Sequence, residues 1–495
     1  MALEDLVHPL LGAYTRSPQW VKSTVGWAYA RLPEVVRLGG RQGQWRSLAR
    51  ERRPEVLHNE AMQRLRQTLK VALEQVPFYA PFRGLARDLE NPLAVLKQLP
   101  VVSKTEIKAE LEAFVARSAT PSRRLETFTG GSTAHPMRFF LERHVTRARE
   151  YAFIADFQGR VGMDSKDVVL ALRGRTVPTA AAGGRLWMYE PIKRQLILSS
   201  DHLTVANMPA YVEAMRRFRP TVIEAYASAL YPLAKWLRFH PADDVLARIK
   251  GVLLYSESVP EHQLALFKQV FGCPVLRHYG HSERVLMAAT LPGDEQRYHF
   301  WPQYGHLELV DHDGRSITQP GMVGEIVGTS FDNQVMPFVR YRTGDLGKWS
   351  WAPADPSLPG FPVLDRVDGR LQEMVVCRDG RLISVTTLGA AHFDELAQVE
   401  AIQYEQREPG VVQLKVQCHA PLPPASRAAI EQAVRDKTQG GCVVQLEEVR
   451  QIKRTARNKQ VMLIQHLDLS RVFASPQAPI EAPSGLPADQ GCGIT

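Results

Sequence analysis

The sequence lacks long apolar runs and closely spaced cysteines. No apolar run approaches the ~20 residues of a membrane span. The five cysteines among 495 residues are scattered without CxxC spacing, which suits a reducing compartment and supports no disulfide framework. Structural zinc sites commonly use cysteines paired at CxxC spacing, and the sequence contains no such cysteine pair. The acidic start and broken apolar stretch at the N-terminus are unlike a secretory signal, so we expect a cytoplasmic location.

Acidic residues are outnumbered by basic ones. The chain has 61 Lys or Arg against 52 Asp or Glu, a net charge of +9. Part of this excess lies near the N-terminus, in a cluster formed by Arg46, Arg50, Arg52 and Arg53. No nucleic-acid-binding motif accompanies the cluster, so we expect no nucleic-acid partner. Two interpretations stay open, a solvated helix face and peripheral contact with an anionic membrane.

The length predicts more than one domain. At 495 residues the chain exceeds the ~250–300 residues at which single cores stop growing. Its 44% hydrophobic and 23% charged residues are typical of a globular protein. Apolar positions at helical spacing over 57–76 predict an amphipathic helix. Ser103 and Glu106 have the spacing of a capping box and predict a second helix, which we expect to extend through Phe114.

The middle of the chain alternates between strand and helix patterns. Strands are predicted at 167–172, 221–225, 251–255 and 274–279, and helices at 228–239 and 260–271. Units of this length predict right-handed crossovers and a parallel sheet buried between helices. Ligands in such sheets bind beyond the carboxyl ends of the strands. Ser256-Glu257 and Tyr279–Glu283 both fall at such ends, which places a candidate site there.

The last third of the sequence predicts short strands and turns. From about Trp301 the pattern predicts β structure, with a hairpin at Asp311–Gly314 and a returning strand over 323–329. A Pro-rich loop is expected at 352–362, and turns are expected at Asp368-Gly369 and Asp379-Gly380. Residues 370–470 suit a small α+β unit.

A glycine-rich segment, Thr127-Phe-Thr-Gly-Gly-Ser-Thr-Ala-His-Pro136, precedes a predicted strand over 137–141. Gly130 and Gly131 have no Cβ and can adopt positive φ, so successive N–H groups can point into one concavity. Side-chain donors are added by Thr129, Ser132 and Thr133. Such a loop suits a polyanion, although the same composition also occurs in ordinary turns.

Four further motifs accompany this loop. They are Tyr279-Gly-His-Ser-Glu283, Tyr341-Arg-Thr-Gly-Asp345, Arg366-Val-Asp-Gly-Arg370 and a lysine near the C-terminus, Lys459. Together with Thr-Gly-Gly-Ser-Thr, and from about residue 60 to 465, they resemble the adenylate-forming, acyl-CoA synthetase superfamily. The branch that they are most similar to contains phenylacetate–CoA ligase and the capsule-biosynthesis, CapK-like, proteins.

The resemblance implies an ATP-dependent reaction in which a small carboxylic acid becomes an acyl-adenylate and is passed to an acceptor, with CoA as the expected co-substrate. It assigns the phosphates to the loop residues Thr129, Gly130, Gly131, Ser132 and Thr133. It assigns Mg2+ to Glu283, a hard oxygen ligand with a catalytic role. Ser256, Glu257, Tyr279, Gly280 and Ser282 would surround the adenine side, while Asp345 and Arg366 would hold the ribose and phosphate side.

The resemblance also implies a domain that rotates between two half-reactions. We expect an α/β N-terminal domain over 1–372 with parallel sheets, flanking helices and a β-rich subdomain. A small mobile α+β domain over 373–474 and a disordered tail over 475–495 would follow. Glu373 matches the hinge, and Lys459 matches the lysine that stabilises the reacting oxygens, with Lys453 as the alternative.

Three departures from the family pattern leave alternatives open. Ala134 and His135 replace the usual glycine and lysine of the loop, and Asn458 replaces the glycine before the lysine. Cysteines that zinc-binding relatives use have no counterpart over 288–300, so we predict no structural zinc. Acyl transfer to a sugar or amine, or a degenerate nucleotide-binding protein without activity, are the alternative functions. The sequence identifies neither the acid nor the oligomeric state.

Overall fold

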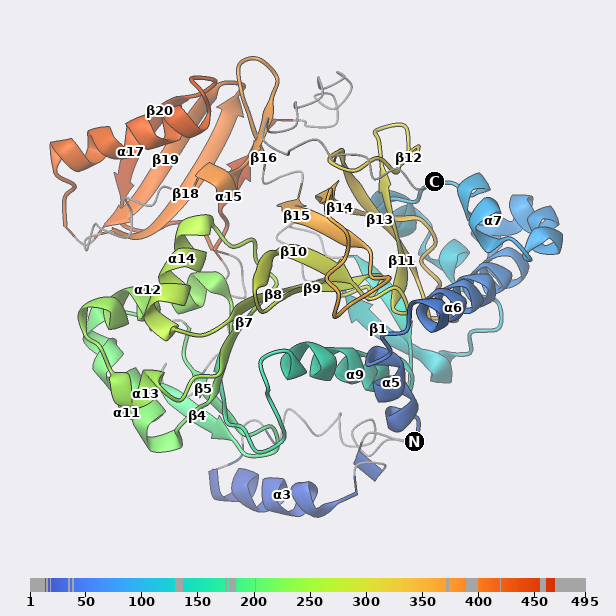
Figure 1. Cartoon of the computed structure of the whole chain (residues 1–495), viewed down its shortest axis with the longest axis horizontal. Coiled ribbons are helices and arrows are strands. Elements are labelled where there is room, and N and C mark those ends of the chain that lie inside the picture. The colour runs from blue at the N-terminus through green and yellow to red at the C-terminus, as the bar shows by residue number, and fades with distance from the viewer. Residues whose placement is uncertain are drawn as a thin grey trace, which may run out of the picture.

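A computed structural model describes most of the chain. The described residues are Tyr14, Ser17, 19–33, 36–37, 40–129, 137–173, Val177, 184–200, 202–370, 374–388, 399–418, 420–454 and 460–467. Figure 1 shows a large α/β body and, at its upper left, a smaller unit built from β16 to β21. Among the described residues, none of the helices has the length and apolar character needed to cross a membrane.

Helices dominate the N-terminal part. They are α3 (Gln19–Arg31), α5 (Gln42–Ala49), α6 (Pro54–Gln75), α7 (Pro92–Gln98) and α8 (Lys104–Ala109), with 3-10 segments η2 (Pro77–Asp88), η3 (Leu111–Phe114) and η4 (Pro121–Arg123). The predicted helix over 57–76 is confirmed, and its apolar stripe is buried. The capping box is confirmed as well, because Ser103 accepts from the Glu106 N–H and Glu106 accepts from the Ser103 N–H. The predicted extension through Phe114 is interrupted after Ala109, where the chain turns into η3.

The central part contains the predicted strand–helix units. The strands are β1 (Arg124–Phe128), β2 (Arg138–Glu142), β3 (Val169–Leu172), β4 (Trp187–Glu190), β5 (Gln195–Leu198), β6 (Val222–Ala225), β7 (Gly251–Tyr255) and β8 (Val275–Gly280). The helical segments are α9 (Thr146–Gly159), η5 (Val205–Asn207), α11 (Met208–Phe218), α12 (Ala227–Phe239), α13 (Asp243–Leu246) and α14 (Glu261–Phe271). The predicted parallel arrangement is confirmed, since β5, β3, β6, β7 and β8 pair in parallel in that order.

The β-rich part continues the same sheet instead of forming a separate one. Its strands are β9 (Met287–Leu291), β10 (Asp294–Phe300), β11 (Gly305–Val310), β12 (Ser316–Ile317), β13 (Val323–Ser330), β14 (Tyr341–Trp349) and β15 (Val363–Arg370). β9 joins the edge of β8 in antiparallel orientation, which gives a 13-stranded mixed sheet. The predicted turn at Asp368-Gly369 is wrong. Gly369 lies in β15 opposite Leu346 of β14, because hydrogen bonding to β14 holds the backbone of this Asp-Gly pair in an extended conformation.

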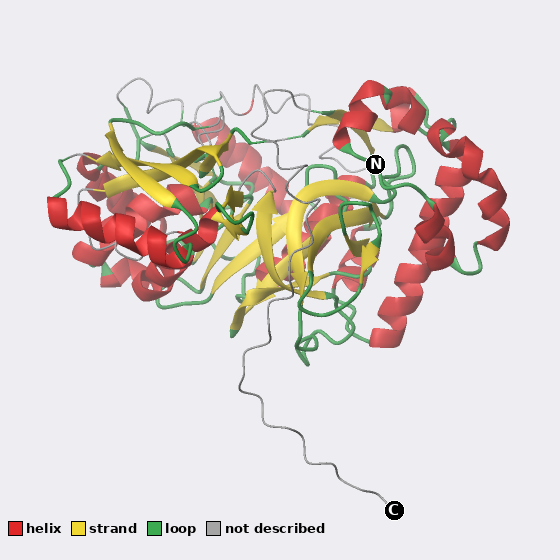
Figure 2. Ribbon diagram, turned by 90° about the horizontal axis from the view of Figure 1, so that it is seen from above, coloured by secondary structure: helices red, strands yellow, loops and turns green. Residues whose placement is uncertain are grey.

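Side chains of both sheet faces form the core. Along β7 the residues alternate between two clusters, with Val252 and Leu254 among the side chains of α11, α12 and α14 and Leu253 and Tyr255 among those of α5 and α9. All five residues of β7 are buried, as expected for a strand covered on both faces. Figure 2 shows the strands in the middle of the large body with helices on both sides.

A second sheet forms the C-terminal unit. Its elements are β16 (Met374–Val376), β17 (Leu382–Ser384), α15 (Val385–Leu388), β18 (Val399–Glu408), β19 (Val411–Cys418), α17 (Pro424–Lys437), β20 (Val443–Val449) and β21 (Leu463–Gln465). The four strands β20, β19, β18 and β21 form one sheet, and α17 contributes Ile430 and Val434 to its core. The described part of residues 374–467 thus contains both strands and helices, and its assignment as a separate domain stays a prediction. This part contacts the large body where Lys235 of α12 donates to the Val399 carbonyl over 2.6 Å.

Candidate functional site

The candidate site lies where the sheet changes from parallel to antiparallel. The loop after β8 carries residues 281–286 and turns the chain into the antiparallel strand β9. Ser256, directly after β7, and Arg284, in this loop, both have left-handed backbone conformations, with φ of 60° and 55°. Such conformations are strained for residues other than glycine and occur often at functional sites. The backbone is thus distorted after both strands, β7 and β8, whose ends the sequence predicts to form the site.

Two motifs that are far apart in sequence meet through Tyr279. Its hydroxyl donates to Oδ2 of Asp345 over 2.9 Å, and Nε2 of His281 lies 2.8 Å from the same hydroxyl. Asp345 is buried on β14, 66 residues further along the chain. Burial, followed by the charge of Asp345, raises the pKa of Tyr279 far above its usual value. The phenol therefore remains a neutral donor that holds the carboxylate in place.

A second tyrosine makes the reciprocal connection. The hydroxyl of Tyr341, at the start of β14, donates to Oε1 of the buried Glu283 over 2.8 Å. Each motif therefore contributes one tyrosine and one carboxylate, and each tyrosine binds the carboxylate of the other motif. The charge of Glu283 also contributes to the raised pKa of Tyr279. Two predicted site carboxylates, Glu283 and Asp345, are brought to the same place.

The backbone at Gly280 has close neighbours. A Cβ built at this position would lie 2.8 Å from Cε1 of His278, so a side chain would displace the imidazole. Desolvation lowers the pKa of His278 to about 3, and the ring is neutral at ordinary pH. Its Nε2 has no hydrogen-bond partner among the described residues and no contact with solvent. The missing side chain of Gly280 thus allows the neutral imidazole of His278 to pack against its backbone.

Glu257 is held by the next helix. Its carboxylate accepts hydrogen bonds from the N–H of Ser228 over 2.9 Å and from the Ser228 hydroxyl over 2.8 Å. Ser228 is in the first turn of α12, where an anion is stabilised by the unpaired N–H groups and the helix dipole. Glu257 therefore fixes the segment after β7 relative to α12. Its predicted place beside the adenine stays a prediction.

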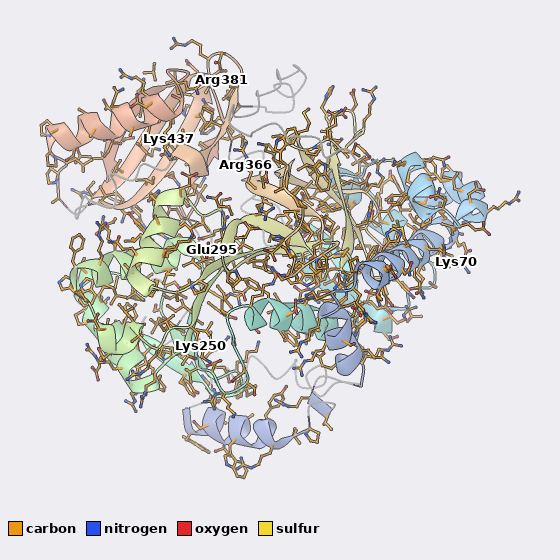
Figure 3. All side chains as sticks on the ribbon, in the orientation of Figure 1. Lys70, Lys250, Glu295, Arg366, Arg381 and Lys437 are labelled. Atoms are coloured by element: carbon orange, nitrogen blue, oxygen red, sulfur yellow. The ribbon has the colours of Figure 1, made fainter. Side chains whose placement is uncertain are left out.

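Three other predicted residues have known positions. Thr129 follows β1, and it is joined to Met137 by a backbone bond of 2.9 Å and by its Oγ1, which accepts from the Met137 N–H over 2.8 Å. These bonds close the two ends of the glycine-rich segment across the β1–β2 hairpin. Ser282 is exposed next to Glu283, and Arg366 is exposed on β15 opposite Lys348. In the view of Figure 3, Arg366 lies on the side of the large body that faces the C-terminal unit.

Several predicted residues lie outside the described part of the chain. They are Gly130, Gly131, Ser132, Thr133, Ala134, His135, Glu373, Asn458 and Lys459. The predicted domain boundary at 372–373 and the tail after 474 also lie outside it. The roles assigned to these residues stay predictions. Lys453, the alternative lysine, is described and exposed, and its backbone N–H donates to Oε1 of Gln403 over 3.2 Å.

A buried polar network beside the site was missed by the sequence analysis. Glu224, inside the apolar strand β6, accepts from Gln158 over 2.7 Å and from Arg173 over 3.2 Å. The guanidinium of Arg173 lies 4.2 Å from the centroid of Tyr255, whose ring packs 5.2 Å from that of His278. Apart from Gln158 of α9, these residues lie near the carboxyl ends of four neighbouring strands, β3, β6, β7 and β8. The sequence signal for this network is a single carboxylate within an otherwise apolar strand, Val-Ile-Glu-Ala.

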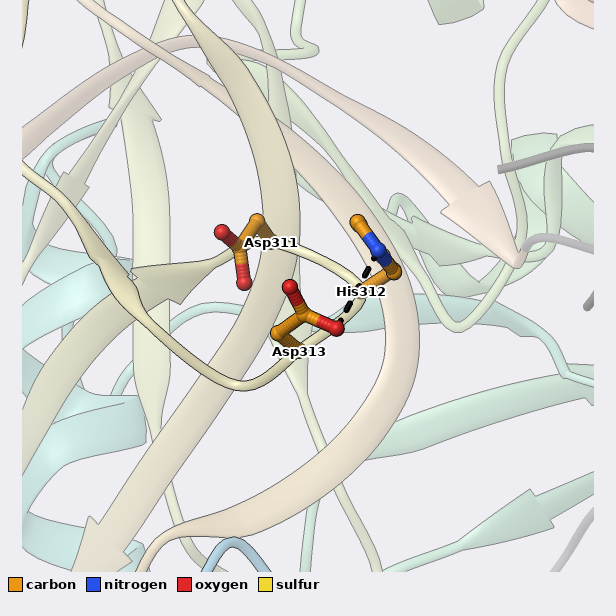
Figure 4. A group of neighbouring side chains, drawn as sticks. All are labelled: Asp311, His312 and Asp313. Carbon is orange, nitrogen blue, oxygen red and sulfur yellow. Dashed lines mark ion pairs between the residues drawn. The ribbon is translucent and has the colours of Figure 1, made fainter. Parts of the chain in front are cut away.

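A group of potential metal ligands occurs elsewhere, on the hairpin between β11 and β12. Figure 4 shows Asp311, His312 and Asp313 with their ligand atoms close together. Nε2 of His312 lies 3.2 Å from Asp313, whose other oxygen is 2.6 Å from Arg315. Asp311 accepts the Arg315 N–H, as expected for the predicted Asp-Gly turn. The group is explained by turn chemistry and by ion pairs at the surface.

Comparison of sequences identifies relatives over part of the chain. No family model matches the chain. Over 169 residues it is 24% identical to a phenylacetate–coenzyme A ligase of Pseudomonas putida, a stretch covering 34% of this chain and 38% of that protein. Over 140 residues it is 31% identical to a phenylacetate–coenzyme A ligase of Thermus thermophilus, covering 27% and 31%. The chain thus matches about a third of the length of these relatives.

Comparison of structures extends over nearly the whole chain. A 2-hydroxyisobutyryl-CoA ligase in its postadenylation state, in complex with 2-HIB-AMP, superposes with a TM-score of 0.62 and 18% identity, covering 86% of this chain and 93% of that one. An open conformation of the same ligase, in complex with 2-HIB-AMP and CoA, gives a TM-score of 0.50 at 18% identity, covering 84% and 93%. At this level of identity the similarity establishes the fold.

Proposed function

We propose, from its adenylate-forming acyl-CoA ligase fold, that this chain is an ATP-dependent ligase that activates a carboxylic acid and transfers the acyl group to CoA. The resemblance predicted from the motifs is confirmed in two respects. The fold matches, and the sequence is weakly similar to phenylacetate–CoA ligases. The capsule-biosynthesis branch stays a prediction. The observation that carries the proposal is the reciprocal pairing of Tyr279 with Asp345 and of Tyr341 with Glu283.

In the first half-reaction a carboxylate oxygen of the acid attacks the α-phosphorus of ATP, and pyrophosphate leaves. In the second, the CoA thiol attacks the acyl carbon, its proton is released, and AMP leaves. The products are pyrophosphate, AMP and an acyl-CoA. Both steps require the nucleotide, the acid and a source of positive charge to meet at one place.

Asp345 is suited to hold the ribose. An ionised carboxylate has about four lone-pair positions, and the described contacts of Asp345 are the hydroxyl of Tyr279 and the imidazole of His281. Capacity therefore remains for two ribose hydroxyls, which carboxylates bind through charge-assisted hydrogen bonds. Since Tyr279 is fixed by its hydroxyl, its ring has a set orientation. Gly280 beside it supplies a backbone without a side chain, which suits close approach of the base.

Glu283 is suited to bind Mg2+. The ion prefers hard oxygen ligands, usually one or two carboxylates together with phosphate oxygens. Oε1 of Glu283 is oriented by Tyr341, and the carboxylate is buried, so it presents a fixed anionic ligand. Bound there, Mg2+ would neutralise charge on the phosphates.

The remaining roles are assigned from the sequence. The backbone N–H groups of 129–133 would bind the phosphates, and Lys459 would stabilise charge on the reacting oxygens. Arg366 would contact the ribose and phosphate side. Glu373 would be the hinge about which the C-terminal unit rotates between the two steps. The closed hairpin at Thr129 and Met137 supports the first assignment, since it fixes both ends of the loop.

CoA is the acceptor that the comparisons favour. The two sequence relatives are named as coenzyme A ligases, and the 2-hydroxyisobutyryl-CoA ligase binds 2-HIB-AMP and CoA. These statements concern those proteins. For this chain, CoA and the identity of the acid belong to the proposal.

The test is a library of carboxylic acids screened for acid-dependent exchange between ATP and pyrophosphate. The proposal expects exchange with at least one chemical class of acid and an acyl-CoA product when CoA is then added. Exchange followed by transfer to an added amine or sugar, and not to CoA, would refute the acceptor alone. Absence of ATP binding in calorimetry would refute the activity and favour the degenerate alternative.

A further inference from the structure

Helix α3 exposes two tryptophans and buries a lysine. Trp20 and Trp27 are 72% and 61% exposed, whereas Lys22 is 8% exposed. Residues seven apart lie on one face of a helix, so the two indoles form a stripe. Arg31 extends this stripe, with its guanidinium 3.4 Å from the centroid of Trp27 and a hydrogen bond to the Trp27 carbonyl. A helix that covers a core buries its apolar face, whereas α3 turns its tryptophans to the solvent.

The inner face of α3 is attached to the large body, so the tryptophans cannot simply turn inward. Gly26 approaches the loop after β4 so closely that a Cβ there would lie 2.7 Å from Pro191. Just before the helix, the hydroxyl of Tyr14 donates to Glu190 of β4 over 2.7 Å. In Figure 1, α3 lies at the lower edge of the molecule, next to β4. The indoles therefore point away from the protein.

The sequence around this helix is predominantly basic. Residues 16–50 contain seven Arg or Lys and one Glu, a net charge of +6, compared with +9 for the whole chain. Tryptophan, with an apolar body and an N–H group, together with arginine is the composition that favours the interface of an anionic bilayer.

We propose that the outward face of α3, formed by Trp20, Trp27 and Arg31, binds peripherally to a bilayer surface containing anionic lipid. A second copy of the chain is the less suitable occupant. A two-fold interface would bring this basic segment against itself, and like charges at an interface oppose association. An anionic leaflet instead complements the charge and accepts the indoles at the level of its headgroups. Taken together with the ligase function proposed above, this places the reaction beside a membrane surface.

The experiment is co-sedimentation of the full chain with vesicles of phosphatidylcholine, with and without phosphatidylglycerol. We expect binding to the anionic vesicles that weakens with added salt. The double variant Trp20→Ala/Trp27→Ala should bind about tenfold more weakly or worse. Arg31→Gln should bind about fivefold more weakly, in line with ~1 kcal/mol per basic residue. Trp351→Ala is the matched control, because Trp351 is 68% exposed on the loop after β14 and should not affect binding.

Folding and self-association are measured in the same variants. Because both indoles are exposed, the double variant should keep the thermal midpoint of the native chain. The proposal would be overturned if the double variant bound anionic vesicles as strongly as the native chain. It would also be overturned if neither chain bound them. A third outcome is that the native chain binds no vesicles but has a doubled mass in light scattering, which the double variant loses. That result would identify a second copy of the chain as the occupant and would also overturn the proposal.

Discussion

Replacing Tyr279 by phenylalanine tests the central contact of the proposed site. The change removes only the hydroxyl that donates to Asp345 over 2.9 Å and lies 2.8 Å from His281. A hydrogen bond to a charged group contributes ~1.5–3 kcal/mol. If that energy holds Asp345 in position for the ribose, its loss weakens nucleotide binding by about 10-fold to 150-fold. The ring itself remains, so contact with the base should be kept.

The assay is the affinity for ATP by calorimetry, with KM for ATP in the exchange reaction as a second readout. Tyr211→Phe is the control, since it removes another buried hydroxyl, which donates to the Ser199 carbonyl over 2.9 Å. Tyr211 is in α11, away from both motifs. We expect Tyr211→Phe to lower stability by ~1 kcal/mol while ATP affinity stays unchanged. Native ATP affinity in Tyr279→Phe would refute the positioning of Asp345 by this phenol.

Three further outcomes are expected. Lys459→Ala should reduce acid-dependent exchange by at least ~100-fold with an unchanged thermal midpoint, whereas Lys453→Ala should be nearly native; the opposite result would transfer the role to Lys453. Glu283→Gln should raise the Mg2+ concentration needed for half-maximal exchange by about tenfold or more, and an unchanged Mg2+ titration would remove this ligand. Because burial lowers the pKa of His278 to about 3, the unfolded chain alone takes up this proton between about pH 6.5 and 3, and stability falls as the pH falls through that range. At pH 5 this proton uptake lowers the free energy of unfolding by at most ~2 kcal/mol. Denaturant titrations should find this loss of stability reduced in His278→Gln but not in His240→Gln, whose imidazole is exposed.

Local structure was predictable wherever neighbours in sequence determine it. The capping box at Ser103 joins residues three apart, and the burial of β7 follows from five consecutive apolar positions. The hairpin turn at Asp311–Gly314 depends on its own side chains and on a positive φ of 79° at Gly314. In each case the energies that decide the conformation arise within a few residues.

Predictions failed where a distant strand decides the conformation. The Asp368-Gly369 pair has turn-forming residues, yet it continues β15 because β14 provides a partner in register. Similarly, the buried Glu224 is satisfied by Gln158 of α9, by Arg173 after β3 and by Tyr255 of β7, all distant in sequence. Neither contact can be inferred from spacing along the chain.

The amino-acid order alone determined most of the element types, the parallel strand–helix units and the identity of the motifs, because propensity, periodicity and turn chemistry act over short distances. Only folding decided that Tyr279 would bind Asp345 and that Tyr341 would bind Glu283, since a strand pairing between residues far apart sets which side chains meet. Folding also decided which face of α3 points outward. That choice depends on how closely Gly26 can approach Pro191, which is a property of the packed molecule.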